Sequence, residues 1–203
     1  MTPARGPLGR FVLKVLAWLP VAFVVWYFGA PLLLWPVKLL LQGIAHAGLP
    51  DLVTAVEQSA ALFTFATTLK PGAADVASAH ITVDVDGLLY SFGMPLYAAL
   101  VLAAREPRWP RTLAIGYAVQ VPFVAWGVLA DFLKNVAITS GPLVTSQAGF
   151  AAWQREAIAF AFQFGSLILP TVVPAVTWVV THLAFLQRLR EHAARGDASS
   201  PPR

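Results

Sequence analysis

Four long stretches of this chain contain almost no charged residue, and this feature limits the possible fold more than any other. Charged residues make up 12% of the 203 residues and apolar residues 58%, whereas roughly 25% charged residues is typical of soluble domains. A helix needs about 20 mostly apolar residues to cross the roughly 30 Å hydrocarbon core of a bilayer. The sequence therefore predicts a helical membrane protein whose four transmembrane helices cover residues 11–30, 88–104, 112–130 and 158–186.

A cleaved signal peptide is a second interpretation of the first stretch. The apolar run is longer than the roughly 7–15 residues of a signal peptide, and Phe28-Gly29-Ala30 does not resemble the usual cleavage site. We therefore favour a transmembrane helix that ends at Pro31.

Residues 31–50 are apolar but interrupted by Lys38, Gln42 and His46, which follow one helix face at a spacing of four residues. The charge distribution decides whether this segment spans, because Lys and Arg gather on the cytoplasmic side of short loops. With four spans, one side receives ten basic and three acidic residues, and the other side four basic and seven acidic residues. A fifth span would place the N-terminal basic cluster opposite the basic loop at 105–111. We therefore predict an interfacial helix at the outer membrane surface, with its apolar side toward the membrane and its polar stripe toward water.

This topology assigns the remaining segments to one side or the other. Both termini are cytoplasmic, with a basic N-terminus at 1–10, a basic loop at 105–111 and a largely disordered tail at 187–203. The segments 51–87 and 131–157 are extracytoplasmic.

The outer segment 51–87 has the pattern of a β-sheet. Ile81, Val83 and Val85 alternate with polar residues, which is typical of a half-buried strand. The upstream candidate strands are residues 52–57 and 61–69, with a turn at Pro71-Gly72 before the last strand. We predict a small antiparallel sheet of two or three strands that rests on the interfacial helix and the helix ends. In the second outer segment we expect a helical extension after Asp131 and then a loop.

The motifs of common catalytic and metal sites are missing from this sequence. It contains no Cys, which excludes disulfides, thiolate ligands and thiol nucleophiles. It contains no G-x-S-x-G, and the nearest pieces, Phe164-Gly165-Ser166 and Tyr90-Ser91-Phe92-Gly93, fit small-residue contacts between helices better. The four His residues are scattered, and Asp84 and Asp86 fit a solvated strand face better than a Ca²⁺ site. We expect no cofactor or metal, and no nucleic-acid partner because no basic stripe is interleaved with aromatic residues.

Polar residues near the outer ends of the predicted spans are more informative, since such residues in a membrane usually have a partner or a task. The candidates are Gln120, Trp126, Asp131, Lys134 and Gln163. Asp131 and Lys134 are three residues apart, which predicts an ion pair. Gln163 enters the last span at a similar depth, which predicts a contact with Gln120 or Asp131. We favour a structural role for these contacts over a substrate site, and transport is disfavoured because the ionisable residues lie at the rims.

Four segments together resemble the exosortase H-associated membrane protein family. They are LKVLAWLPVAFVVWYFGAPLLLWPVKLL, VEQSAALFTF, VDVDGLLYSFGMPLYAAL and VPFVAWGVLADFLKNVA. The resemblance covers most of residues 11–186 and implies a bacterial inner membrane protein that acts beside an exosortase, a sortase-like transpeptidase for proteins with a C-terminal sorting segment. Exosortases use a Cys nucleophile with Arg and His, so the resemblance also implies that this Cys-free chain is not the transpeptidase.

Two functions from different classes follow. The first is a non-enzymatic accessory subunit, embedded in the lipid bilayer and bound to an exosortase-like membrane protein. Its candidate contact residues are Trp35, Tyr90, Gln120, Trp126, Asp131, Lys134 and Gln163. The alternative is a membrane-embedded enzyme that acts on a lipid-linked or peptide substrate at the outer face, with Asp131, His80 or His46 as acid or base. The enzyme requires at least two of those three side chains to converge within hydrogen-bond reach.

Overall fold

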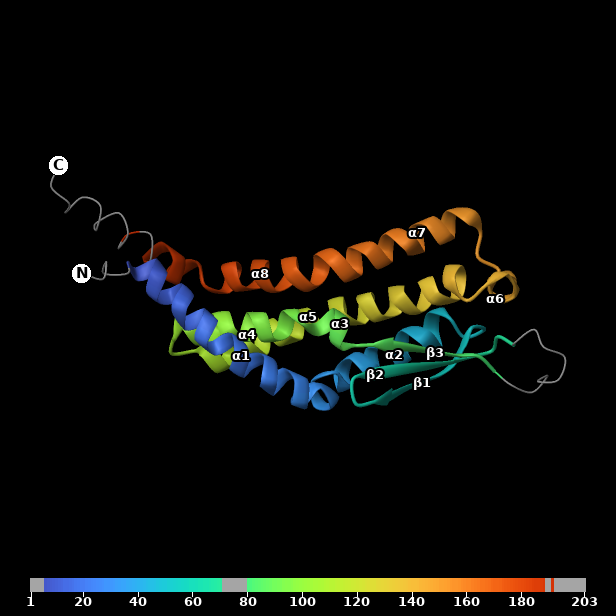
Figure 1. The fold of residues 1–203 in the computed structure, drawn as a ribbon, viewed down its shortest axis with the longest axis horizontal. Coiled ribbons are helices and arrows are strands. Elements are labelled where there is room, and N and C mark those ends of the chain that lie inside the picture. The colour runs from blue at the N-terminus through green and yellow to red at the C-terminus, as the bar shows by residue number, and fades with distance from the viewer. Residues whose placement is uncertain (1–5, 71–79, 189–190, 192–203) are drawn as a thin grey trace.

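The computed structural model describes residues 6–70, 80–188 and 191. An elongated bundle of helices carries a small sheet near one end, while α1 begins and α8 ends at the opposite end (Figure 1). In chain order the elements are α1 (Pro7–Leu33), α2 (Trp35–Gly48), β1 (Val53–Ser59), β2 (Leu62–Thr67), β3 (Thr82–Asp86), α3 (Leu88–Ser91), α4 (Gly93–Ala104), α5 (Trp109–Lys134), η2 (Asn135–Thr139), α6 (Pro142–Ala148), α7 (Ala152–Gln163), η3 (Phe164–Ile168) and α8 (Leu169–Thr181), where η marks a π-helical segment. The expected turn at Pro71-Gly72 and most of the tail expected to be disordered lie outside the described residues.

Three helical stretches are long and apolar enough to cross a membrane. They are Leu8–Leu33, Trp109–Thr139 and Ala152–Thr181, and Leu88–Ala104 is a shorter apolar helix. This confirms the prediction of a multi-pass helical membrane protein. The second and third stretches have 31 and 30 residues, so at 1.5 Å per residue each is about 45 Å long and exceeds the roughly 30 Å hydrocarbon core.

The first helix continues beyond its predicted end. It includes Pro31 and ends at Leu33, because a single Pro removes only one backbone donor and the N–H of Leu34 still donates to the carbonyl of Ala30 at 2.9 Å. The chain then enters α2 directly.

The predicted antiparallel sheet is confirmed, with three strands in the order β1-β2-β3. Phe63 is opposite Val85, and Phe65 lies between Val56 and Val83 on its two neighbours. These five side chains are buried on one face of the sheet, as expected for strands of alternating pattern with one face on a core.

Helix α2 packs differently from the prediction. Its buried residues Val37, Leu41 and Ala45 join the same core as Val56 and Phe63. The expectation that this apolar side faces the membrane is therefore wrong. An amphipathic helix buries its apolar stripe against the apolar layer that packs on it, and for this stripe that layer is the sheet.

The expectation of a loop after the helical extension at Asp131 is also wrong. The chain continues from α5 through η2, α6 and α7 with only short interruptions. Gly141 has φ 90° and Gly149 has φ 68°, and these positive values let the chain turn between short helices. The Gly-Pro pair that reads as a loop signal in the sequence is a helix start, with Pro142 in its first turn.

Glycines mark the closest approaches between the bundle helices. A Cβ on Gly165 would lie 3.1 Å from the Cα of Gly127, and one on Gly93 would lie 2.3 Å from the carbonyl oxygen of Pro170. The prediction that the segments around Gly93 and Gly165 are small-residue helix contacts is therefore confirmed.

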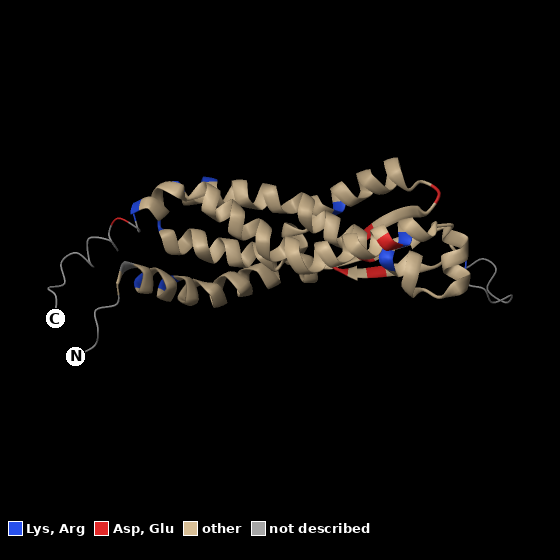
Figure 2. Ribbon diagram, turned by 90° about the horizontal axis from the view of Figure 1, so that it is seen from above, with Lys and Arg blue, Asp and Glu red and all other residues tan. Residues whose placement is uncertain are grey.

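Charge is unevenly distributed along the bundle. Lys and Arg gather at the end where α1 begins, Asp and Glu gather around the sheet, and the helices between these ends carry neither (Figure 2). The charge-free band is the part of the molecule whose composition suits hydrocarbon.

Candidate functional site

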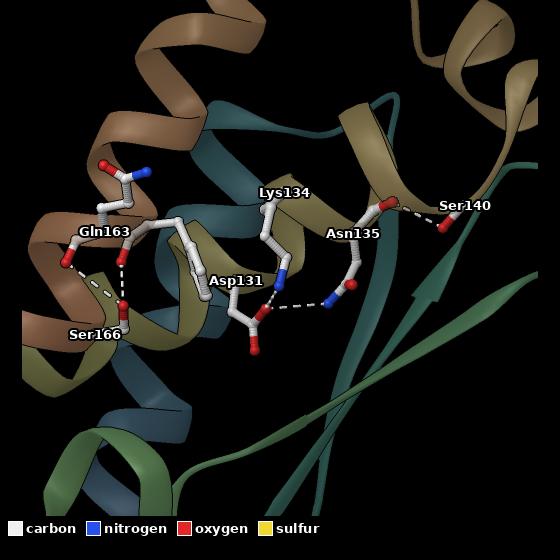
Figure 3. A network of polar contacts seen from close by, with 7 residues as sticks. Asp131, Lys134, Asn135, Ser140, Gln163 and Ser166 are labelled. Atoms are coloured by element: carbon white, nitrogen blue, oxygen red, sulfur yellow. Dashed lines mark hydrogen bonds and ion pairs between the residues drawn. The ribbon is translucent and has the colours of Figure 1, made fainter.

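The strongest candidate site is a polar cluster where α5 leaves the charge-free band and meets the sheet. Asp131 Oδ1 accepts a hydrogen bond from Lys134 Nζ at 2.8 Å and another from Asn135 Nδ2 at 3.2 Å (Figure 3). The predicted ion pair of Asp131 and Lys134 is confirmed. Both donors lie within one helical turn of the carboxylate, so the sequence places them locally.

Lys134 also connects this cluster to α7. Its ammonium lies 3.9 Å from the centroid of the Phe162 ring, a cation–π contact that suits a partly desolvated lysine. Phe162 accepts a second contact through its backbone, because Ser166 Oγ donates to its carbonyl at 2.8 Å. The lysine therefore contacts α5 and α7 at the same time.

Two π-helical segments flank the cluster. η2 begins directly after Lys134 and η3 begins directly after Gln163. Single-turn π-helices often occur at functional sites because they rotate the side chains that follow.

An aromatic stack fixes the sheet to the bundle beside the same cluster. The rings of Phe65 on β2 and Phe132 on α5 lie 4.3 Å apart at 17° and are fully buried. Both belong to the core that also contains the α2 stripe. Sheet, α2 and α5 therefore form one packed unit.

Tyr90, on α3, packs against α5 one helical turn before Asp131. Its ring packs on Gly127, where an added Cβ would come within 2.3 Å of the ring, and the residue is buried. Next to it, Ser91 Oγ accepts a hydrogen bond from Trp26 Nε1 at 3.2 Å.

The predicted contact of Gln163 with Gln120 or Asp131 is wrong. Gln163 is exposed, and in Figure 3 its side chain points away from Asp131. Gln120 is buried and donates to the carbonyl of Gly116 in its own helix at 3.1 Å. Phe162, one residue earlier, faces the cluster instead, because one residue turns a helix face by about 100°.

The two candidate tryptophans are both on the surface. Trp126 is 50% exposed, and its Nε1 donates to the carbonyl of Ala161 at 3.3 Å. Trp35, the first residue of α2, is 54% exposed.

The structure does not connect the three candidate acid or base residues of the alternative enzyme. Within the described ranges, no hydrogen bond or ion pair links any two of His46, His80 and Asp131. His46 lines a groove between α2 and β1, which neither of the other two lines. In the part of the chain that the structure describes, no three His, Cys, Asp or Glu side chains are grouped in a way that could hold a metal ion.

Chemically, this cluster is suited to holding elements together. Its carboxylate is occupied by two donors, its lysine by a carboxylate and a ring, and its tyrosine is buried. Sequence reasoning found Asp131, Lys134 and Tyr90 but missed Phe65, Phe132 and Phe162, because each of those three acts through a partner distant in the sequence.

The fold and this junction together define a class, a multi-pass helical membrane protein that carries a three-stranded sheet clamped to one end of its bundle. The chain belongs to the exosortase H-associated membrane protein family, whose model matches residues 5–185. This confirms the resemblance, and the family name implies an association with exosortase H. The search of curated proteins and the search of solved structures each returned no match.

Proposed function

We propose that this protein is a non-enzymatic accessory subunit of exosortase H, with four membrane spans, cytoplasmic termini and the sheet on the extracytoplasmic side. The charge distribution supports this orientation. The basic end contains the loop at 105–111, and the positive-inside rule places such a loop in the cytoplasm.

The register of the two longest helices supports an outer boundary at Asp131. A Cβ on Gly165 would lie 3.1 Å from the Cα of Gly127, and Asp131 and Ala161 are each four residues from that contact toward the sheet end, so they lie at similar depth. Residues 112–131 and 161–181 each contain about 20 residues, which matches a hydrocarbon core of about 30 Å. The shorter helix at 88–104 then packs on both of these helices as the fourth span. The junction of α1 and α2 lies inward of this boundary, because the Tyr117 hydroxyl donates to the carbonyl of Leu33.

The observation that carries the proposal is the rigid attachment of the sheet to the bundle. The stack of Phe65 on Phe132 and the Asp131–Lys134–Phe162 contacts tie the outer elements to two spans. Such an arrangement holds an outer surface at a constant height and orientation. That is what an accessory subunit needs in order to position a membrane partner.

A strip of exposed apolar side chains at the α1–α2 junction is the proposed contact surface. Leu32, Trp35 and Leu39 are 79%, 54% and 47% exposed and recur at helical spacing. Aromatic residues such as Trp are enriched in protein–protein contacts. The more buried candidates support this strip by holding the helices and the sheet together; they are Tyr90, Gln120, Asp131 and Lys134. The other two candidates, Trp126 and Gln163, lie on the exposed side of α5 and α7.

The test is site-specific photo-crosslinking in native membranes. A photoreactive residue at Trp35 is expected to capture exosortase H, identified by mass spectrometry. The matched control is Val180, which is 62% exposed at the basic end of α8 and is expected to capture none. Asp131→Ala is expected to reduce the yield at Trp35 because it loosens the elements behind the strip.

The alternative enzyme is distinguished in the same experiment. A protein that crosslinks to no exosortase at Trp35, and that turns over a lipid-linked or peptide substrate when purified alone, would overturn the proposal. Loss of that turnover on His46→Ala or His80→Ala would then assign the chemistry to the outer face.

A further inference from the structure

A groove opens within the charge-free band between α1, α4 and α5. Its volume is about 480 Å³, within the roughly 300–1,000 Å³ range of small-ligand sites. Trp18 and Val25 form one wall, Tyr97 and Leu102 the second, and Leu113 and Tyr117 the third. The groove therefore runs along the bundle, with the end at Trp18, Leu102 and Leu113 nearest the basic end.

The wall of the groove offers little to a polar ligand. The Tyr97 hydroxyl donates to the carbonyl of Thr112 at 2.9 Å, and the Tyr117 hydroxyl donates to the carbonyl of Leu33 at 2.8 Å. Gln120 Nε2 is likewise engaged by its own helix. Because these donors are already used, the occupant that suits this wall is a hydrocarbon chain.

Its size distinguishes a hydrocarbon chain from a protein helix. A helix with side chains is at least 10 Å across, so a 30 Å length of it fills roughly 2,400 Å³. The groove is several times smaller, which suits an extended acyl chain.

Two cations lie at the basic end of the helices that line the groove. Lys14 precedes Trp18, Val21 and Val25 by four, seven and eleven residues, so it continues the face of α1 that lines the groove. On α5, Arg111 lies three residues before Ala114, at the edge of the face that lines the groove. In the described part of the chain neither cation forms an ion pair. Glu106, at the same end of the bundle, forms an ion pair with Arg188 at 2.8 Å.

We propose that this groove binds one anionic phospholipid, with an acyl chain between α1, α4 and α5 and the phosphate at Lys14 and Arg111. Basic pockets between helices at a membrane surface recognise anionic headgroups in this way. Under the proposed topology the lipid belongs to the cytoplasmic leaflet, but the site itself does not depend on that orientation or on exosortase.

The test is native mass spectrometry of the purified full chain, titrated with phosphatidylglycerol or with phosphatidylcholine of the same acyl chains. The unmodified protein is expected to retain one phosphatidylglycerol in preference to phosphatidylcholine. The double variant Lys14→Gln/Arg111→Gln is expected to lose roughly 25-fold in phosphatidylglycerol affinity, about fivefold for each cation. The matched control Lys38→Gln/Arg155→Gln removes two charges at the sheet end and is expected to change nothing.

A second pair of variants tests whether the groove binds the acyl chain of the lipid. Ala114→Phe fills the groove and is expected to weaken both lipids, whereas Ala175→Phe, on an exposed face of α8 outside the groove, is expected to weaken neither. Equal retention of the two lipids by the unmodified protein would overturn the proposal, and so would equal losses in the two charge variants. A protein adduct in place of a lipid adduct would assign the groove to a second copy or a partner helix instead.

Discussion

Replacing Phe132 with Ala removes one half of the stack that joins the sheet to α5. Phe132 and its partner Phe65 are both fully buried, with ring centroids 4.3 Å apart. Truncating a buried Phe to Ala costs about 3–5 kcal/mol, because apolar contact is lost and a cavity remains. Since the contact lies between the sheet and the bundle, we expect most of this cost to appear as easier separation of the sheet from α5.

Hydrogen exchange followed by mass spectrometry measures that separation directly. A loss of about 3 kcal/mol corresponds to roughly 100-fold faster exchange of the β2 amides through local opening, whereas the amides of α8 should keep their rates. Phe28→Ala is the matched control, because Phe28 is 77% exposed on α1. Its effect on the sheet amides should be negligible.

A double-mutant cycle tests whether the stack itself carries the effect. Phe65→Ala combined with Phe132→Ala should cost less than the sum of the two single variants, with a coupling of about 0.5–1.5 kcal/mol typical of aromatic pairs. Strictly additive costs, or sheet amides that exchange no faster in Phe132→Ala than in Phe28→Ala, would refute the reasoning.

Three further outcomes are expected. Because the native chain has no Cys, single variants report topology: Asp84→Cys should react with an impermeant maleimide in spheroplasts and Arg108→Cys only after permeabilisation, and the reverse pattern would invert the topology. Gly127→Ala should lower thermal stability in detergent by about 1–3 kcal/mol, because its Cβ meets the ring of Tyr90 at 2.3 Å. The control Gly43→Ala, whose Cβ has nothing within 4 Å, should be neutral or gain about 0.5–1 kcal/mol. Equal effects of the two variants would contradict this packing. Asp131→Ala should lower stability by about 1–3 kcal/mol because a partly buried lysine loses its partner, and a melting temperature equal to that of Asp84→Ala would argue against it.

Local patterns in the sequence predicted the membrane helices, the last strand and one ion pair. A helix that crosses the hydrocarbon core needs a long apolar run, so such helices can be predicted without any knowledge of packing. The alternation around Val83 and the three-residue spacing of Asp131 and Lys134 depend only on backbone geometry over a few residues. The structure has three helices long enough to span a membrane and a shorter apolar helix at Leu88–Ala104, and the last strand and the ion pair agree with the prediction.

Tertiary structure decided the contacts that join distant segments. The side of α2 that is buried, the stack of Phe65 on Phe132 and the choice of Phe162 over Gln163 each depend on how one element is rotated against another. A rotation of one residue turns a helix face by about 100°, and no residue in isolation specifies that rotation. The short helices that follow Asp131 were not predicted for a related reason. Gly141 and Pro142 can begin a short helix as readily as they form a loop. Composition therefore determined the membrane environment of this protein, while packing determined how its sheet is held to the bundle.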